Sequence, residues 1–322
     1  MIEADPRIIG VIDIGKTNAK VVVFDLATRH EPETLSTANK VLNTGPYPHY
    51  DIDGLWYFIV ESFKTLGTRH KVDAISITTH GACAALLKEN GALALPVLDY
   101  EHDGPQSVSN AYDAVRPPFS ETGSPRLPNG LNLGAQIFWQ AKAFSEQFVD
   151  VRWIVTYPQY WAFRLCGVLS VEATSLGCHT DLWVYANSDY SSIVDNMGWR
   201  KLMPAVHKSS DRLGTLSSQI AQDTGLDLGT PVHCGIHDSN ASLLPHLLAH
   251  EPPFSVVSTG TWVIGMAIGG KRMMLDPTRD TLVNVNAFGE AVPSARFMGG
   301  REFEMHQSLL AKRHQRLMLM QC

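Results

Sequence analysis

The chain begins with two short apolar segments separated by a polar loop. Residues 8–13 (IIGVID) and 20–24 (KVVVF) are rich in β-branched side chains, which favour strands. The loop between them contains Gly15, Thr17 and Asn18, which are residue types that turns favour. This pattern predicts a β-hairpin.

The next segments predict a helix and a further strand. Residues 40–54 contain several Gly, Pro and Asn and predict a loop or a weak strand. Residues 55–66 (LWYFIVESFKTL) are long enough for a helix, and residues 72–78 (VDAISIT) alternate as a strand does before Thr79, His80 and Gly81. This order predicts antiparallel pairing first and then a βα crossover to a parallel strand.

The middle of the chain predicts loops and then helices. Residues 103–134 are rich in Pro, Gly, Ser and Asn, which indicates surface loops. Helical patterns follow near residues 136–149 and 158–165, and Gly167 is placed to end the second. An aromatic cluster in this region predicts core packing rather than a stacking platform; it comprises Trp153, Tyr157, Tyr160, Trp161 and Phe163.

The last third of the chain repeats the pattern of the first segment. A short strand is predicted at residues 231–236, followed by an apolar helix from Asp238 to residue 248. Two apolar strands then flank a polar turn formed by Ser258, Thr259, Gly260 and Thr261. This second hairpin predicts two related domains whose hairpin loops face one cleft.

Composition excludes several classes of function. The chain has 322 residues, of which 44% are apolar and 18% charged, and its formal net charge is −6, so no basic footprint for nucleic acid or anionic membrane is present. The start lacks the features of a signal peptide, and no apolar run of 18 residues occurs. The five cysteines form no CxxC pair. We expect a cytoplasmic α/β protein.

The two polar loops are candidates for phosphate binding. Asp13 at a strand end suits a Mg²⁺ ion bound through water, Gly15 lets the backbone approach a phosphate, and Thr17 and Lys20 supply donors. The alternative for each loop is an ordinary tight turn, and no P-loop sequence is present. The two matched loops together are stronger evidence for phosphate binding than either loop alone, because a nucleoside triphosphate needs contacts from both sides.

Asp238 is the candidate for acid–base chemistry. A carboxylate there could accept the proton of an attacking hydroxyl, or it could simply cap the helix that follows. His80 is either a structural histidine or a binding residue, and Asp99 either lines a polar substrate wall or lies in a loop. Zinc is disfavoured for His233, Cys234 and His237, because residues four apart on a strand are about 13 Å apart.

Taken together, these segments resemble the FGGY carbohydrate kinases of the sugar kinase and actin superfamily. The resemblance rests on four motifs in order: DIGKTNAK at residues 13–20, TTHGA at 78–82, GIHD at 235–238 and STGTW at 258–262. Connecting segments at residues 132–136, 163–167 and 172–174 are also similar. The resemblance extends over nearly the whole chain, to about Arg301.

The resemblance implies two ribonuclease-H-like domains around a cleft, with ATP, Mg²⁺ and a small-molecule sugar as ligands. It implies an N-terminal sugar-binding domain at residues 1–244 and an incomplete nucleotide-binding domain of the same fold at 245–322. Asp238 would be the general base, and Asp13 and Asp238 would lie at the metal. The implied nucleotide contacts are Asp13, Gly15, Lys16, Thr17, Asn18, Lys20, Ser258, Thr259, Gly260 and Thr261. The implied sugar contacts are His80, Gly81, Asp99, His237 and Asp238.

The pair His237–Asp238 is similar to the rhamnulose and fuculose kinases, which implies a ketose or a 6-deoxyketose as substrate. Residues 98–102 (LDYEH) differ from the Trp-x-Asp-x-Arg segment of some relatives. The glycine-rich adenosine segment of the family is missing after residue 301, so we expect a truncated kinase. The alternatives are an inactive sugar- or nucleotide-binding remnant and an actin- or chaperone-like ATPase. The sequence leaves open whether the chain forms a homodimer.

Overall fold

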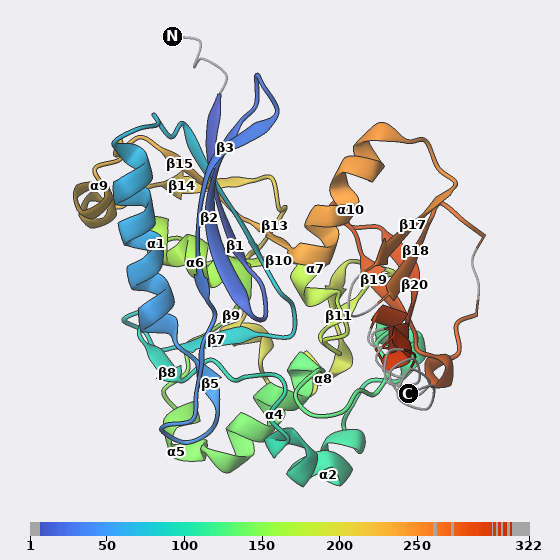
Figure 1. The fold of residues 1–322 in the computed structure, drawn as a ribbon. Coiled ribbons are helices and arrows are strands. Elements are labelled where there is room, and N and C mark those ends of the chain that lie inside the picture. Colours follow the sequence, from blue (N-terminus) through green and yellow to red (C-terminus); the bar gives the residue numbers. More distant parts are fainter. Residues whose placement is uncertain are drawn as a thin grey trace, which may run out of the picture.

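The fold consists of a large N-terminal part and a smaller C-terminal part. A computed structural model describes residues 7–259, 263–271, 274–297, 299–300, 302–303, 305–307 and 310. The predicted phosphate contacts Gly260 and Thr261 lie outside these residues. Figure 1 shows a twisted sheet on the left, with helix α1 beside it, and a second sheet with helix α10 on the right.

The N-terminal part is built on a seven-stranded sheet with the order β14–β15–β6–β1–β2–β3, and β16 also pairs with β6. Its strands are β1 (Ile8–Ile14), β2 (Asn18–Asp25), β3 (His30–Ala38), β6 (Ala74–Thr79), β14 (Arg212–Thr215), β15 (Pro231–His233) and β16 (Ile236–His237). Strands β1 and β2 form the predicted antiparallel hairpin, and β6 lies parallel to β1. The prediction of antiparallel pairing followed by a crossover is confirmed.

Strand β3, the third strand along the chain, was not predicted by the hydrophobic pattern. Its side chains are exposed or only half-buried, and Pro32 interrupts it. The register of β2 and β3 shifts beside this proline, between Val23 and Asp25. Proline is tolerated at such bulges and at sheet edges. The weak strand expected at residues 40–54 is instead two short strands, β4 (Val41–Leu42) and β5 (His49–Tyr50), in a separate sheet.

Helix α1 (Ile52–Gly67) makes the crossover between β3 and β6. The Asp51 side chain caps its N-terminus by accepting a hydrogen bond from the Gly54 amide. Its buried residues recur every three or four positions, as in an amphipathic helix: Ile52, Leu55, Ile59, Ser62, Phe63 and Leu66. Their burial in the main hydrophobic core holds α1 to the sheet.

Helix α6 (Tyr157–Cys166) lies in the same core and ends at Gly167, which adopts the left-handed conformation that ends many helices. The aromatic cluster predicted here is core, because Tyr157, Tyr160 and Trp161 are at most 2% exposed and Trp153 and Phe163 pack against them. Helix α9 (Ser218–Thr224) packs against α1.

A second group of elements connects these strands, and part of it, including α4 and α5, lies below the sheet in Figure 1 around a core of its own. Its strands are β7 (Ala84–Leu87), β8 (Leu93–Leu95), β9 (Trp153–Thr156), β10 (Val171–Glu172), β11 (Trp183–Val184), β12 (Asp189–Tyr190) and β13 (Val206–His207). Its helices are α2 (Ser109–Asp113), α3 (Phe119–Thr122), α4 (Leu133–Ala143), α5 (Ser145–Phe148), α7 (Ala173–Leu176) and α8 (Ser192–Asn196), with 3₁₀ turns at Gly104–Val108 and Arg200–Leu202. The helix predicted at residues 136–149 is therefore two helices.

The C-terminal part is helix α10 (Asp238–Ala249) packed on an antiparallel sheet with the order β17–β18–β20–β19. The strands are β17 (Phe254–Thr259), β18 (Val263–Ile268), β19 (Thr281–Val285) and β20 (Ala291–Phe297), and a 3₁₀ turn covers Pro277–Arg279. Strands β17 and β18 pair as the predicted second hairpin. The Val283 amide donates to the Gly123 carbonyl oxygen, which links this sheet to the N-terminal part.

The strand predicted at residues 231–236 is broken in two. Gly235 adopts φ +87°, and a Cβ there would lie 2.8 Å from the Ile77 carbonyl oxygen. A glycine is therefore needed to end β15 and let β16 start again beside β6. The Gln159 side chain holds this break by donating to the carbonyl oxygens of Cys234 and Gly235.

The described residues bear on two predictions from composition. No helix in the described part of the chain is long and apolar enough to cross a membrane. The cysteines that the structure describes are Cys83, Cys166, Cys178 and Cys234, and all four are free thiols.

A buried ion pair fixes the segment that follows α7. Arg116 Nε donates to Asp181 Oδ2 at 2.9 Å, and Arg116 Nη2 donates to the other carboxylate oxygen at 2.9 Å. Tyr112 donates to the same carboxylate at 2.7 Å, and Asp181 is fully buried. This two-pronged contact anchors the loop that carries residues 178–181.

We predict that Arg116→Met lowers the free energy of unfolding by about 3–5 kcal/mol, because it leaves the Asp181 carboxylate buried without its counter-charge. Urea unfolding at neutral pH measures the loss. Arg200→Met is the matched control, since Arg200 pairs with Asp189 and Asp195 at the surface and exposed pairs contribute little. Equal losses in the two variants would contradict the anchoring role of Asp181.

Candidate functional site

Three strands of the N-terminal sheet end side by side, and each carries a predicted site residue. Strand β6 pairs in parallel with β1, where Asp13 lies opposite Thr78, and with β16, where His237 lies opposite Thr79. The carboxyl ends of parallel strands meet at one edge of a sheet, which is where α/β proteins bind ligands. The topology therefore brings Asp13, His80 and Asp238 to the same edge.

A cavity of about 470 Å³ opens at this edge. It is lined by His80, Gly81, Ala82, Tyr100, Glu101, Asn129, Leu131, Cys178, His179, His237, Asp238, Ser239, Ile264, Leu282, Asn284 and Arg296. The last four come from the C-terminal sheet, so both parts of the fold form its wall. Of the predicted sugar contacts, His80, Gly81, His237 and Asp238 line this cavity, whereas Asp99 does not.

Asp238 is the first residue of α10, and the N-cap position is occupied by His237. The Asp238 side chain is 42% exposed, and its Oδ1 atom lies 3.2 Å from His237 Nε2. Oδ1 also accepts a hydrogen bond from the Ser239 amide at 2.6 Å. Asp238 is therefore not the N-cap of this helix, because it lies inside the first turn. Its carboxylate reaches the cavity.

His237 is held from three sides. Its amide donates to Thr174 Oγ1 at 3.1 Å, and that hydroxyl donates to the buried carboxylate of Glu172 at 2.5 Å. Gly81 lies against the ring, because a Cβ at Gly81 would be 2.6 Å from His237 Nε2. Burial lowers the pKa of His237, but the nearby Cys178 and Asp238 outweigh it and raise the pKa to about 9. These neighbours therefore favour the protonated form of His237, whose Nε2 can donate to Asp238 Oδ1.

The pKa of His80 is shifted in the opposite direction to that of His237. Burial lowers its pKa to about 4, so its ring is neutral at neutral pH. Its Nδ1 lies 2.9 Å from the Gly81 carbonyl oxygen and must carry the proton, which makes Nε2 an acceptor. That Nε2 atom is buried without a hydrogen-bond partner. It is suited to receive a hydrogen bond from a hydroxyl in the cavity.

The first polar loop closes as a tight turn in which the Gly15 amide donates to the Asn18 carbonyl oxygen at 2.8 Å. Thr17, Asn18 and Lys20 are exposed at its surface. The pKa of Asp13 is raised because burial disfavours its charge and Asp238 repels it, although Lys20 acts in the opposite direction. Two carboxylates that repel each other at a strand end are a donor set that suits Mg²⁺, which is bound through one or two carboxylates and water.

Lys16 lies apart from the other loop residues. Its Nζ atom forms an ion pair with buried Asp99 and is 3.4 Å from Glu101 Oε2. It also lies 4.7 Å from the ring centre of Tyr100. Two residues that the sequence assigned to different ligands, Lys16 and Asp99, are therefore partners, and together they support the cavity wall formed by Tyr100 and Glu101.

The second polar loop belongs to the hairpin of β17 and β18. Ser258 and Thr259 are exposed at the end of β17, opposite Ile264 and Val263. Neither residue lines the cavity, but their neighbour Ile264 does. In the described part of the chain, no group of three or more His, Cys, Asp or Glu is placed to hold a metal ion.

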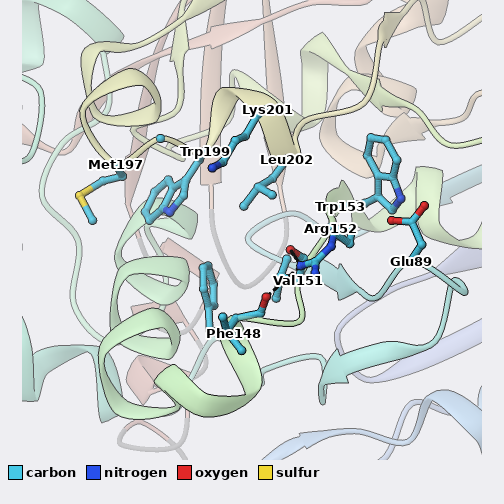
Figure 2. A pocket seen from close by; sticks show the side chains of 11 residues that line it. Glu89, Phe148, Val151, Arg152, Trp153, Met197, Trp199, Lys201 and Leu202 are labelled. Carbon is cyan, nitrogen blue, oxygen red and sulfur yellow. Dashed lines mark hydrogen bonds between the residues drawn. The ribbon is translucent and has the colours of Figure 1, made fainter.

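A second cavity, of about 570 Å³, lies elsewhere and contains none of the predicted residues. Figure 2 shows Trp199, Lys201 and Leu202 on one side of it and Phe148 and Val151 on the other. Its wall is largely apolar, with Glu89, Arg152 and Lys201 at its margin. It therefore lacks the converging polar groups of the cavity at Asp238.

Sequence reasoning missed eight polar residues of the site: Tyr100, Glu101, Asn129, Cys178, His179, Ser239, Asn284 and Arg296. Except for Ser239, which follows Asp238 on α10, they lie in loops or on strands far along the chain from the motifs, and no spacing rule connects them. The Cys178–His179 dipeptide was the one local signal, because adjacent thiol and imidazole groups often mark reactive sites.

The comparisons with known proteins agree with this geometry. Residues 8–245 match the N-terminal domain model of the FGGY family of carbohydrate kinases, and residues 251–318 match an FGGY carbohydrate kinase C-terminal domain model. An L-fuculokinase from Salmonella typhi is 22% identical over 271 residues, covering 82% of this chain and 57% of the relative. An L-fuculokinase from Escherichia coli K12 is 22% identical over 279 residues, covering 81% of this chain and 56% of the relative.

Solved structures support the same conclusion. A carbohydrate kinase from Novosphingobium aromaticivorans is 37% identical with a TM-score of 0.87, covering 93% of this chain and 65% of its own length. A xylulose kinase from Lactobacillus acidophilus shares the fold, with 16% identity and a TM-score of 0.76 over 89% of this chain and 59% of its own. This confirms the expected sugar-kinase and actin-like α/β fold. The chain spans little more than half the length of the curated relatives, and it belongs to the FGGY family of carbohydrate kinases.

Proposed function

We propose that this chain transfers a phosphoryl group from ATP to a hydroxyl of a ketose or 6-deoxyketose, with Asp238 as general base. The observation that carries the proposal is the placement of Asp238. Its partly exposed carboxylate lies on the wall of a polar cavity, beside His80 and His237 and near Asp13. Phosphoryl transfer to a hydroxyl needs a carboxylate in this position and little other covalent chemistry from the protein.

Each of these side chains has a role in the proposal. Asp238 Oδ1 is engaged by His237 and the Ser239 amide, which leaves Oδ2 to accept the proton of the substrate hydroxyl. His80 Nε2 accepts a hydrogen bond from a second hydroxyl of the sugar. The bond from His237 orients the Asp238 carboxylate, and the rigid support of Thr174 and Glu172 keeps His237 in place.

ATP with Mg²⁺ supplies the phosphoryl group and neutralises its developing charge. Asp13 and Asp238 would hold the ion, and Thr17, Asn18 and Lys20 with the Gly15 backbone would face the phosphates, whereas Lys16 is paired with Asp99. Ser258, Thr259, Gly260 and Thr261 would contact them from the other side. We keep the domain division at residues 1–244 and 245–322 and a cytoplasmic location as proposals, and the family-model ranges support the former.

The substrate class rests on similarity to relatives. Two L-fuculokinases are among the matching proteins, and their substrates are 6-deoxyketoses by name. The matching xylulose kinase acts on a ketose by name. Because the chain spans only part of each relative, turnover by these 322 residues is the first property to measure.

We predict that the purified chain releases ADP from Mg²⁺-ATP when L-fuculose or another ketose is present, and much less without sugar. A coupled assay across ketoses, deoxyketoses and polyols measures this. ADP release that is independent of sugar would instead favour an actin- or chaperone-like ATPase. Sugar binding by calorimetry without ADP release would favour an inactive binding protein, and either outcome would contradict the kinase.

We predict that Asp238→Asn lowers kcat by about 10²–10⁴-fold, because the amide cannot take the substrate proton. Circular dichroism and urea unfolding should be unchanged, since the Asp238 side chain is 42% exposed. Asp223→Asn, an exposed carboxylate on α9, is the matched control and should keep full activity. Normal turnover by Asp238→Asn would remove the general-base assignment.

We predict that Lys16→Met raises KM for the sugar roughly tenfold, the effect of losing one charge-assisted contact. The reason is that Lys16 forms an ion pair with Asp99, and this pair supports the cavity wall formed by Tyr100 and Glu101. Lys20→Met is the matched comparison, because Lys20 is exposed on β2 just after the same loop and its loss should raise KM for ATP instead. If Lys16→Met changed KM for ATP alone, Lys16 would belong to the phosphate site.

A further inference from the structure

Strand β19 of the C-terminal sheet carries an asparagine at a position where a buried strand normally carries an apolar residue. Asn284 lies within the sequence TLVNV and is 8% exposed. Asparagine is depleted in strands and is mostly found at protein surfaces. The alternate residues Val283 and Val285 pack against the N-terminal part, whereas Leu282 and Asn284 line the candidate sugar cavity. The polar side chain therefore lies on the cavity side of the strand.

The amide of Asn284 is oriented by a hydrogen-bond relay with strand β20. The Ser294 hydroxyl donates its proton to the Val292 carbonyl oxygen at 3.0 Å, so its oxygen can act only as an acceptor toward Asn284. Asn284 Nδ2 donates to this oxygen at 3.1 Å. The relay fixes which end of the amide is the nitrogen, and it leaves Oδ1 as the end that does not face Ser294.

Asn284 Oδ1 lacks the partner that a buried carbonyl oxygen normally has. It is buried and accepts no hydrogen bond from the residues that the structure describes. His80 Nε2, which belongs to the N-terminal part and to the same cavity, is in the same condition. Both residues are more than nine-tenths buried. Buried polar atoms are normally paired, so two such atoms in one cavity indicate a molecule that bonds to both.

The chemistry of these two atoms indicates a sugar rather than a phosphate as their neighbour. Both are acceptors, because Oδ1 is a carbonyl oxygen and the proton of His80 lies on Nδ1, toward the Gly81 carbonyl oxygen. Phosphate oxygens are largely deprotonated at neutral pH, since the second pKa of a phosphate monoester is about 6. They would be repelled by both acceptors. The hydroxyls of a neutral polyol can donate to each of them.

We propose that Asn284 is a specificity-determining residue that binds the sugar from the C-terminal sheet. Its Oδ1 atom accepts a hydrogen bond from one hydroxyl of the sugar, while His80 Nε2 accepts one from another hydroxyl. This inference rests on the proposed kinase function and adds to it a contact from the second part of the fold. A sugar without the hydroxyl that Asn284 receives leaves Oδ1 buried and unpaired, so the chain discriminates against that sugar.

A comparison within the same hairpin separates a binding role from a structural one. Asn286 is structural, because its Oδ1 atom accepts hydrogen bonds from the amides of Phe288 and Glu290 in the turn between β19 and β20. Asn286→Leu should therefore lower the free energy of unfolding of the ligand-free chain. Asn284→Leu should leave it unchanged or raise it, since it removes a buried acceptor that has no partner.

The test is isothermal titration calorimetry of the full chain without ATP, with ketoses, deoxyketoses and polyols as probes. For the sugar that binds most tightly, we expect Asn284→Leu to weaken binding about tenfold, the effect of losing one hydrogen bond. Thr281→Val removes a hydroxyl of the same strand that donates to the Asp276 carbonyl oxygen, and this matched control should bind normally. In turnover, Asn284→Leu should raise KM for the sugar and leave KM for ATP unchanged.

Monodeoxy analogues of that sugar identify the hydroxyl. The unaltered chain should bind one analogue about tenfold more weakly than the parent sugar because Asn284 loses its partner, and Asn284→Leu should bind the two equally. It should still discriminate at the hydroxyl that His80 receives. Asn284→Ala, which adds no bulk to the wall, takes its place if Asn284→Leu does not fold.

Two results would overturn the proposal, and they differ from a failure of the kinase function. One is unchanged sugar affinity in the Asn284 variants. The other is the same loss for the parent sugar and for every analogue, which would indicate a structural role. If the unaltered chain bound no sugar at all, the proposed function itself would be wrong, and the contact with it.

Discussion

The site depends on the parallel pairing of β6 with β1 on one side and β16 on the other. This pairing sets Ile14 opposite Thr79 and Ile236 opposite Thr78, so the three strands end at one level. Side chains that are far apart along the sequence then project from one edge of the sheet. Gly235 makes the alignment possible, because without the break at that residue β15 would run on in its own register rather than resume as β16 against β6.

The same edge collects charges that are expensive to bury, and the surrounding structure offsets each of them. Burial lowers the pKa of both histidines, but at His237 the charges of Cys178 and Asp238 outweigh it, whereas at His80 burial prevails. Asp99 is buried with Lys16 as its counter-charge. An unpaired charge in such a place lowers the stability of the fold. The stability of the cavity wall therefore depends on the same residues that would bind ligands.

The sequence was sufficient where a local pattern decides the structure. Both hairpins, helix α1 and the stop at Gly167 follow from alternation, amphipathic spacing and turn chemistry. Strand β3 could not be found in this way, because it lies at the sheet edge, is mostly exposed and contains Pro32. The partnership of Lys16 with Asp99 was also out of reach, since 83 positions separate them and only the tertiary fold brings them together.

The motifs place the predicted sugar contacts in the N-terminal part and at the first residue of α10, but the cavity is closed by the C-terminal sheet. Leu282, Asn284 and Arg296 supply one side of its wall. Strand β19 is held to the N-terminal part by the bond from Val283 to Gly123 and by the packing of Val285 on Leu176. The candidate sugar cavity is therefore formed by both parts together, so a change in their packing alters its wall.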